Sequence, residues 1–344
     1  MKRKKDDLLK QPRRGIVCAG NWLLDYVNFI PTYPEAGNLV TIEKLSTGFG
    51  GCAHNVVADL AGLKTDLPLY ACGCIGSDSP GNDIMKLLLK LNIDATGMER
   101  TNQPTSYTQV MSDSSHATRT FFHNRGANAL LNVDHLMKVN APAKIFHLGY
   151  LLLLDALDAD DGQYGTRAAR ALHDLQQKGY LTSVDVVSEE SDRFRKIVLP
   201  SLRYIDYFII NEVEAGKCFG YSLRSADGKI LLPKVAEAAE FLISHGVRRV
   251  CAIHFPEGGY ALTKEGETRF VPSIRIPASG IVSSVGAGDA FTAGMLYALH
   301  ENYSLTQALR IGAASAYYNL KSPTSTGGAP RLTQIEEFIK THYE

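Results

Sequence analysis

Strand-like and helix-like segments alternate along most of the 344-residue sequence, and no other feature restricts the possible folds as strongly. Apolar runs bounded by glycine at residues 15–21 and 67–76 are typical of buried β-strands. Apolar residues at helical spacing at 54–63 and 163–179 predict amphipathic helices. Because such helices need an apolar surface to cover, the alternation predicts an α/β fold with a mainly parallel sheet flanked by helices.

The same patterns continue to the C-terminus. A hairpin at 259–273 is expected to turn at Glu265-Gly266. Further strands are predicted at 143–154, 181–187, the first part of 204–220 and 248–255, and further helices at 83–92, 232–246, 289–301, 305–320 and 332–342.

Two segments break this alternation and predict a separate lid. Residues 39–49 and 105–124 alternate with period two, are rich in Thr, Ser, Val, Tyr and Phe, and have no helix beside them. They predict a small antiparallel β lid, with lid segments at about 30–49 and 105–125 of a single domain that spans 15–344. An ordinary surface hairpin is the alternative interpretation.

Charge and cysteine usage exclude several classes of function. The 36 basic and 36 acidic residues cancel, so no electrostatic argument favours nucleic acid or an acidic membrane as a partner. The basic cluster near the start has no apolar segment after it, so residues 1–14 are interpreted as a flexible terminus and not as a secretory signal. The six cysteines include a lone C-x-C at Cys72 and Cys74, a poor zinc motif, which favours reduced thiols in a cytoplasmic protein.

The stretch "SSVGAGDAFTAG" contains the first candidate site. Gly286, Ala287 and Gly288 precede a helical run, so their N–H groups lack helical partners and carry the positive end of the helix dipole. Such a position favours an anion, and Asp289 stands beside it. A glycine turn followed by an acidic cap is the alternative interpretation of the same residues.

The stretch "IINEVEA" contains a candidate cation site. Asn211, Glu212 and Glu214 directly follow a strand, and strand C-termini form the ligand crevice of an open parallel sheet. Their oxygens suit a hard cation such as Mg²⁺. Asn211 and Glu214 also have the spacing of a helix capping box, and capping and metal binding can coexist.

A second glycine loop and a further acid stand near the N-terminus. Gly48, Gly50 and Gly51 precede a helix that contains Asn55, so the backbone there can approach a ligand closely. Asp25 follows a β-rich run in "AGNWLLDYV" and could accept hydrogen bonds from hydroxyl groups.

Together these motifs resemble those of the ribokinase-like (PfkB) carbohydrate kinases. "GAGDAFTAGMLYAL" is similar to the C-terminal signature of that family, and "GGCAHNVVADLAGL" to its N-terminal signature. "NEVEA" resembles its N-x-x-E metal motif, and "IGSDSPGNDI" its G-x-D-x-x-G stretch. The four occur in the expected order, and the resemblance extends from Gly15 to about Tyr343.

The resemblance implies an ATP-dependent kinase that transfers the γ-phosphoryl group to a hydroxyl, expected to be primary, of a small carbohydrate. Asp289 would be the base, and the amides of Gly286, Ala287 and Gly288 would form the anion hole. Asn211 and Glu214 would organise Mg²⁺, and Asp25, Gly50, Gly51 and Asn55 would bind the sugar hydroxyls. The nucleotide side would include Asn211, Ala313, Ala316, Asn319 and Gly327. The lid would match the lid of the family, which often also forms a homodimer contact.

Three departures from the family pattern leave questions open. Ser283 and Ser284 replace the usual Asp-Thr pair, so activation by K⁺ is in doubt. The loop Gly-Gly-Cys-Ala-His-Asn differs from the ribokinase loop, so ribose is not implied. His254 replaces a residue of the usual nucleotide-side turn and either faces the nucleotide or is a loop residue.

Two other functions are possible on the same fold. A nucleoside kinase, of adenosine or pseudouridine type, would use a base-stacking aromatic side chain in the lid, for which Tyr107, Phe121 and Phe122 are the candidates. The second possible function is that of a catalytically decayed protein that binds a sugar or nucleotide. The sequence leaves open which sugar is used, which hydroxyl reacts, whether the substrate already carries a phosphate, and the oligomeric state.

Overall fold

The computed structural model describes residues 12–116 and 118–344, and its main element is a nine-stranded sheet. The strands lie in the order β15 (Thr268–Pro272), β14 (Gly258–Thr263), β13 (Val250–Phe255), β12 (Tyr207–Asn211), β11 (Leu181–Val186), β8 (Ile145–Leu151), β1 (Ile16–Gly20), β4 (Leu69–Gly76) and β5 (Asp94–Thr101). All pairs from β13 to β5 are parallel, and the two pairs that involve β14 are antiparallel. The predicted α/β architecture with a mainly parallel sheet is confirmed.

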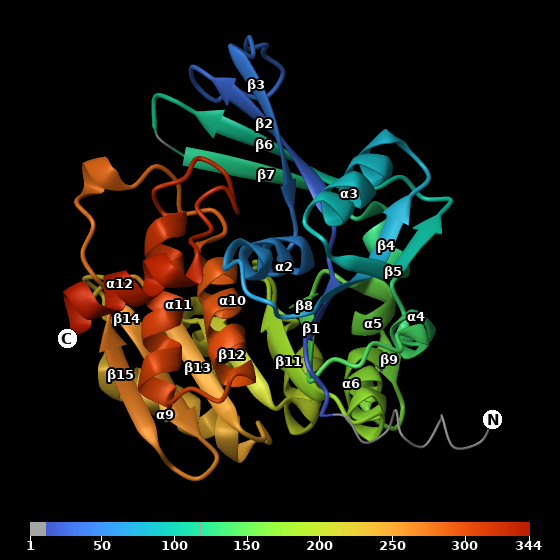
Figure 1. Cartoon of the computed structure of the whole chain (residues 1–344). Helices are drawn as coiled ribbons and strands as arrows, with labels where there is room; N and C mark the ends of the chain where they lie inside the picture. Colours follow the sequence, from blue (N-terminus) through green and yellow to red (C-terminus); the bar gives the residue numbers. More distant parts are fainter. Residues whose placement is uncertain (1–11, 117) are drawn as a thin grey trace.

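Helices cover both faces of this sheet (Figure 1). One face packs against α4 (Val133–Lys138), α6 (Arg167–Gln177), α8 (Glu212–Phe219) and α9 (Leu232–Ser244), and the other against α2 (Cys52–Gly62), α3 (Ser79–Lys90), α10 (Ala287–His300), α11 (Leu305–Asn319) and α12 (Leu332–Tyr343). In β1, Val17 and Ala19 belong to the first core, and Ile16 and Cys18 to the second. Because strand side chains alternate between faces, a central strand needs an apolar residue at every position, as β1 has.

The remaining elements are short. They are α5 (Asp155–Asp158), α7 (Phe194–Ile197), β9 (Asp160–Asp161), β10 (Gly165–Thr166), and the 3₁₀ turns η2 (Gly126–Leu130), η3 (Leu199–Tyr204) and η4 (Ala278–Gly280). The predicted turn at Glu265-Gly266 falls between β14 and β15. In the described part of the chain, no helix combines the length and the apolar character that a membrane crossing requires.

The lid is a separate four-stranded sheet in the order β3 (Lys44–Gly50), β2 (Leu23–Ile30), β6 (Ser106–Asp113) and β7 (Thr118–Asn124), which stands above α2 in Figure 1. Its outer pairs are antiparallel, but β2 and β6 pair in parallel, so the prediction of a purely antiparallel lid is wrong. The reason is the origin of the two central strands. β1 leads into β2, and β5 leads into β6, and β1 and β5 run in the same direction in the main sheet.

Most of the segment interpreted as a flexible terminus, 1–14, lies outside the described residues. Of its last residues, Arg13 donates hydrogen bonds to the carbonyl oxygens of Ala143 and Lys178, and its guanidinium lies 4.2 Å from the centre of the Tyr180 ring. These contacts attach Arg13 to the edge of the main domain.

Candidate active site

A cavity of about 810 Å³ lies between the lid and the carboxyl ends of the central strands. Its wall includes Asp25, Asn55, Tyr150, Asp185, Glu214 and Asp289. The wall therefore combines the lid strands β2, β6 and β7 with α2, β8, β11, α8 and α10, as expected for the ligand crevice of an open parallel sheet. We call this space the first cavity.

A second cavity, of about 730 Å³, lies beside the first. It is largely apolar, and its wall includes Phe255, Ile274, Ile276, Phe291, Ala313 and Ala316. The two cavities have Asn211, His254 and Gly288 in common. The site therefore offers two adjoining spaces, one acidic and one apolar, that meet at the beginning of α10.

The N-terminus of α10 is open to the first cavity. Gly286 is its N-cap residue at φ 83°, and no side chain caps the helix. A Cβ at this position would lie 2.3 Å from the carbonyl oxygen of Ser325, so only glycine fits. Among the described residues, no protein acceptor bonds the N–H groups of Gly286 and Gly288. These groups can therefore donate to an anion, whereas the N–H of Ala287, the third amide of the predicted anion hole, donates to the carbonyl oxygen of Ser284 at 3.3 Å.

Asp289 is buried at the wall of the first cavity and has two hydrogen-bond donors. Its Oδ2 accepts from Asn55 Nδ2 at 2.7 Å, and its Oδ1 accepts from the hydroxyl of Tyr150 at 2.9 Å. Burial raises the pKa of Asp289 to about 6, and the two donors oppose that rise. The carboxylate is thus fixed in orientation and close to the pKa that suits a base near neutral pH.

The predicted sugar-binding residues converge on the lid side of the first cavity. Asp25, Gly51 and Asn55 line it. Gly50 does not line it but lies against Asp25, where a Cβ would be 2.4 Å from Asp25 Oδ2. Gly51 has φ 94°, and a Cβ there would be 2.3 Å from the carbonyl oxygen of Asn21. Burial raises the pKa of Asp25 to about 6, and a hydrogen bond from Thr108 partly opposes this rise.

The residues predicted to organise Mg²⁺ form a capping box at the start of α8. Asn211 Oδ1 accepts from the N–H groups of Val213 and Glu214, each at 2.9 Å. Glu214 Oε2 accepts from the N–H of Asn211 at 2.9 Å, and its Oε1 accepts from the hydroxyl of Ser188 at 2.7 Å. Both residues also line the first cavity, so the cap faces the candidate site.

The acidic groups around this cap fit a divalent cation. Asp185, Glu214 and Asp289 are all buried on the wall of the first cavity. Within the described ranges, no lysine, arginine or histidine forms an ion pair with any of them. Burial raises the pKa of Glu214 to about 7, and burial and the neighbouring carboxylates raise that of Asp185. Buried carboxylates without positive partners favour a bound cation, and Mg²⁺ prefers such oxygen ligands.

The predicted nucleotide-side residues divide into two groups. Ala313 and Ala316 line the second cavity, and Asn211 lines both cavities. Asn319 and Gly327 do not line the second cavity. Asn319 is buried and donates to the carbonyl oxygen of Ser325 at 2.5 Å, in the loop that contacts Gly286. Asn319 therefore supports the loop behind the anion site.

The first cavity also contains residues that were not predicted from the sequence, among them Tyr150, Asp185 and Arg119. Asp185 carries a signal, because a carboxylate stands among the valines at the end of the strand "LTSVDVV". Tyr150 and Arg119 carry none, since tyrosine and arginine are ordinary in a strand end and a lid strand. Arg119 reaches from β7 to within 3.4 Å of the hydroxyl of Ser283, which precedes the anion site.

The lid aromatics predicted for a nucleoside site lie in different environments. Phe121 lines the first cavity, whereas Tyr107 and Phe122 do not. Tyr107 packs edge-on against Tyr26, with ring centres 6.0 Å apart. Phe122 is half-exposed.

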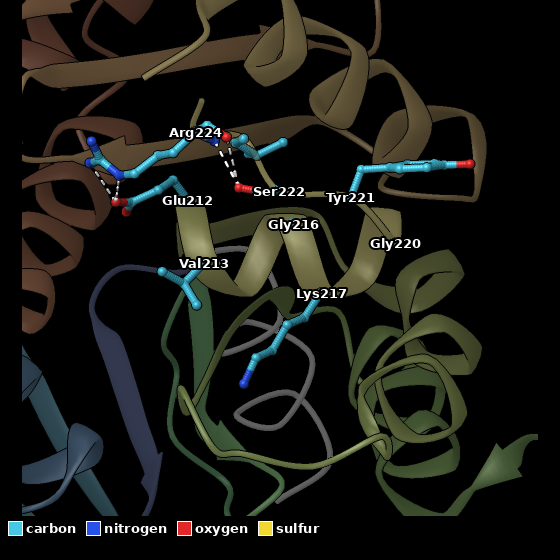
Figure 2. A pocket seen from close by; sticks show the side chains of 9 residues that line it. Glu212, Val213, Gly216, Lys217, Gly220, Tyr221, Ser222 and Arg224 are labelled. Carbon is cyan, nitrogen blue, oxygen red and sulfur yellow. Dashed lines mark hydrogen bonds and ion pairs between the residues drawn. The ribbon is translucent and has the colours of Figure 1, made fainter. Parts of the chain in front are cut away.

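A third hollow, of about 400 Å³, lies on the outer side of α8 (Figure 2). Its wall includes Val213, Gly216, Lys217 and Tyr221. Arg224 closes one end through ion pairs with Glu212 at 2.6 Å and Glu257 at 2.8 Å. The side chains in Figure 2 point in different directions, and of the residues shown Glu212 and Val213 also line the second cavity.

Comparisons with known proteins agree with this geometry. A family model for "pfkB family carbohydrate kinase" matches residues 14–331. A 5-dehydro-2-deoxygluconokinase from Geobacillus kaustophilus is 37% identical over 106 residues, which are 31% of this chain and 31% of that protein. A nucleoside kinase from Methanocaldococcus jannaschii is 21% identical over 335 residues, 95% of this chain and 97% of that protein.

A solved structure of Arabidopsis thaliana ribokinase, complexed with ribose and ATP, has the same fold with a TM-score of 0.77. The two chains are 21% identical, and the match covers 95% of this chain and 99% of the ribokinase. At that identity the likeness establishes the fold.

Proposed function

The chain belongs to the pfkB family of carbohydrate kinases, and we propose that it transfers the γ-phosphoryl group of ATP to a hydroxyl, expected to be primary, of a small carbohydrate. The observation that carries this proposal is the meeting of the two cavities at Gly288, beside Asp289. The acidic first cavity suits the hydroxyl groups of a sugar, and the apolar second cavity suits adenine. A phosphoryl group at the junction of the two cavities would be within reach of a sugar in the first cavity and of the nucleotide in the second.

Asp289 is proposed to accept the proton of the attacking hydroxyl. Its carboxylate faces the first cavity and is held by Asn55 and Tyr150, so it needs little reorganisation before reaction. A positioned base of this kind contributes about 10²- to 10⁴-fold in rate. The open N–H groups of Gly286 and Gly288 would stabilise the negative charge on the transferred group.

Asn211 and Glu214, with Asp185 nearby, are the residues that would hold Mg²⁺. When bound, Mg²⁺ supplies positive charge that neutralises the phosphate oxygens. The chain itself keeps the cap rigid, because Asn211 and Glu214 exchange hydrogen bonds and both bond Ser188. The lid would exclude water, which would otherwise compete with the sugar as acceptor.

His254 is proposed to contact the phosphate groups at the junction. It lines both cavities, and its ring lies 4.9 Å from that of Phe291. A Cβ on Gly288 would be 3.1 Å from its Cε1, so the ring lies directly beside the start of α10. Burial lowers the pKa of His254 to about 4, so the ring is neutral at neutral pH and can donate one N–H.

A nucleoside acceptor is the second candidate, and Phe121 is the observation that favours it. This side chain lines the first cavity from the lid, where an aromatic ring could stack on a base. The relative from Methanocaldococcus jannaschii is named a nucleoside kinase. A catalytically decayed binding protein is less well supported, since Asp289, its two donors and the open helix terminus are all in place.

The test is an acceptor screen that measures ADP formation from ATP and Mg²⁺. The panel contains pentoses, hexoses, keto-acid sugars and nucleosides, and Asp289→Asn serves as the control for contaminating kinases. We expect one small group of acceptors to give ADP and a phosphorylated product in equal amounts. Activity with nucleosides alone would select the second candidate. Folded protein that phosphorylates no acceptor would contradict both kinase assignments and support the binding protein.

A further inference from the structure

We propose that a binding site for Zn²⁺ lies in the wall of the first cavity, formed by Cys52 Sγ and the carboxylates of Asp185 and Asp289. One donor atom from each of the three residues lies within 4.8 Å of the other two, and all three side chains are buried. They come from α2, β11 and α10, so the packing of the fold, and not a single loop, brings them together.

The position of the Cys52 thiol is well defined. Its Sγ lies 3.4 Å from His147 Nε2 and donates to Asp185 Oδ2 at 3.6 Å. Gly149 makes the room for it, because a Cβ there would be 2.2 Å from the sulfur. The Sγ is therefore held between a nitrogen donor and an oxygen donor.

His147 contacts the sulfur of this group without belonging to the group of three donor atoms. Its Nδ1 is 3.1 Å from the hydroxyl of Ser183, and its Nε2 faces the sulfur.

The distances suit a tetrahedral metal. Zinc bonds are about 2.3 Å to sulfur and about 2.0–2.2 Å to nitrogen and oxygen, so neighbouring ligands of a tetrahedral site lie about 3.5 Å apart. The Cys52–Asp185 distance of 3.6 Å already matches this spacing. On binding, a Zn–S bond replaces the S–H bond of Cys52, and the proton is released to water.

Sulfur distinguishes this site from that proposed for Mg²⁺, and Asp185 lies beside both. Asn211 and Glu214 offer only oxygen, which suits a hard cation, whereas thiolate selects Zn²⁺ and similar metals. The first cavity provides the entry path, because Asp185 and Asp289 line it.

One consequence rests on the proposed function. Zinc held by Asp289 would occupy the place assigned to the acceptor hydroxyl and would block the base. Zn²⁺ would then inhibit competitively with the sugar and not with ATP.

The binding test needs no catalytic activity. The full-length protein is titrated with Co²⁺ alone, which gives a near-ultraviolet thiolate charge-transfer band only if sulfur is a ligand. Zn²⁺ affinity is measured by competition with a chromophoric chelator. We expect one cobalt per chain with the band in the wild type, and loss of the band with about 100-fold or weaker Zn²⁺ binding in Cys52→Ser.

Cys251→Ser is the matched control, because Cys251 is equally buried but belongs to the core on the opposite face of the sheet. It should keep the band. Asp185→Asn provides a second variant if Cys52→Ser fails to fold, and it should weaken Zn²⁺ binding as well. A wild type without the band, or a band that survives in folded Cys52→Ser, would overturn the proposal while leaving the kinase assignment intact.

Discussion

The side-chain amide of Asn55 donates a hydrogen bond to Asp289 Oδ2 at 2.7 Å, across 234 positions of sequence. Asn55 lies in the first turn of α2, behind the glycine loop at Gly50 and Gly51, and Asp289 lies in the first turn of α10, behind Gly286. The bond therefore joins the two glycine-rich helix starts. It also gives the carboxylate a fixed orientation, with Tyr150 on its second oxygen.

The first prediction concerns the base. Asp289→Asn should lower kcat by about 10²- to 10⁴-fold and leave sugar binding almost unchanged, because an amide cannot accept the hydroxyl proton. Steady-state kinetics and sugar titration of the variant provide the measurement. Asp83→Asn, on the exposed side of α3, should behave as the wild type. Near-normal turnover in Asp289→Asn would remove this residue from the role of base.

The second prediction concerns pH. The pKa of Asp289 is raised to about 6, so kcat/KM should fall about tenfold per pH unit below about pH 6, as the base becomes protonated. The effect on stability has the opposite sign. Between about pH 4 and about pH 6 the unfolded chain releases a proton that the folded protein retains, so the free energy of unfolding falls as pH rises.

The variant Asp289→Asn should lack the contribution of Asp289 to this fall in the free energy of unfolding. The stability of the variant relative to the wild type should increase between about pH 4.5 and about pH 7.5, as measured by denaturant unfolding of the ligand-free proteins. A difference that does not change with pH would show that the carboxyl of Asp289 has an ordinary pKa in the folded protein.

The presence of a mainly parallel sheet covered by helices could be predicted because the signals of its strands and helices are local. A buried parallel strand is apolar at each position, and a covering helix is apolar at every third or fourth, so the sequence around Val17 and Ala19 differs clearly from that of α6. The glycines before α10 are equally local signals, since their conformation depends on their own backbone.

The direction of the lid strands could not be predicted in this way. An alternating pattern indicates which face of a strand is buried, but it is the same for parallel and antiparallel pairing. The pairing of β2 with β6 depends on the directions in which β1 and β5 leave the main sheet. Tyr150 likewise carries no local signal, because its contact with Asp289 arises only when β8 lies beside α10.

The third prediction concerns the metal. Glu214→Gln should raise the Mg²⁺ concentration needed for half-maximal activity, because one carboxylate charge is lost while the side chain can still accept from the N–H of Asn211. A magnesium titration at fixed ATP is the measurement, and thermal unfolding checks that α8 is intact. Glu237→Gln, which alters the exposed ion pair with Lys234 on α9 and lies outside both cavities, is the control. An unchanged titration in Glu214→Gln would count against the metal assignment.

The fourth prediction concerns His254. His254→Ala should lower kcat/KM for ATP by about 10- to 100-fold, the effect of removing one hydrogen bond to a charged group. His254→Gln should recover part of this loss, since it keeps a neutral donor. His173, which packs on Tyr164 outside both cavities, provides the control His173→Ala. If alanine and glutamine at 254 give equal kinetics, the ring fills space and makes no hydrogen bond to the phosphates.

The fifth prediction uses two glycines of the same strand, β3. A Cβ at Gly50 would lie 2.4 Å from Asp25 Oδ2, whereas a Cβ at Gly48 would have nothing within 4 Å. Gly50→Ala should therefore displace the Asp25 carboxylate and raise KM for the acceptor about tenfold, within the ~1–3 kcal/mol that overpacking costs. KM for ATP should stay the same, because Asp25 does not line the second cavity. Gly48→Ala should leave both constants unchanged. Equal effects of the two substitutions on acceptor KM would mean that Asp25 does not contact the acceptor.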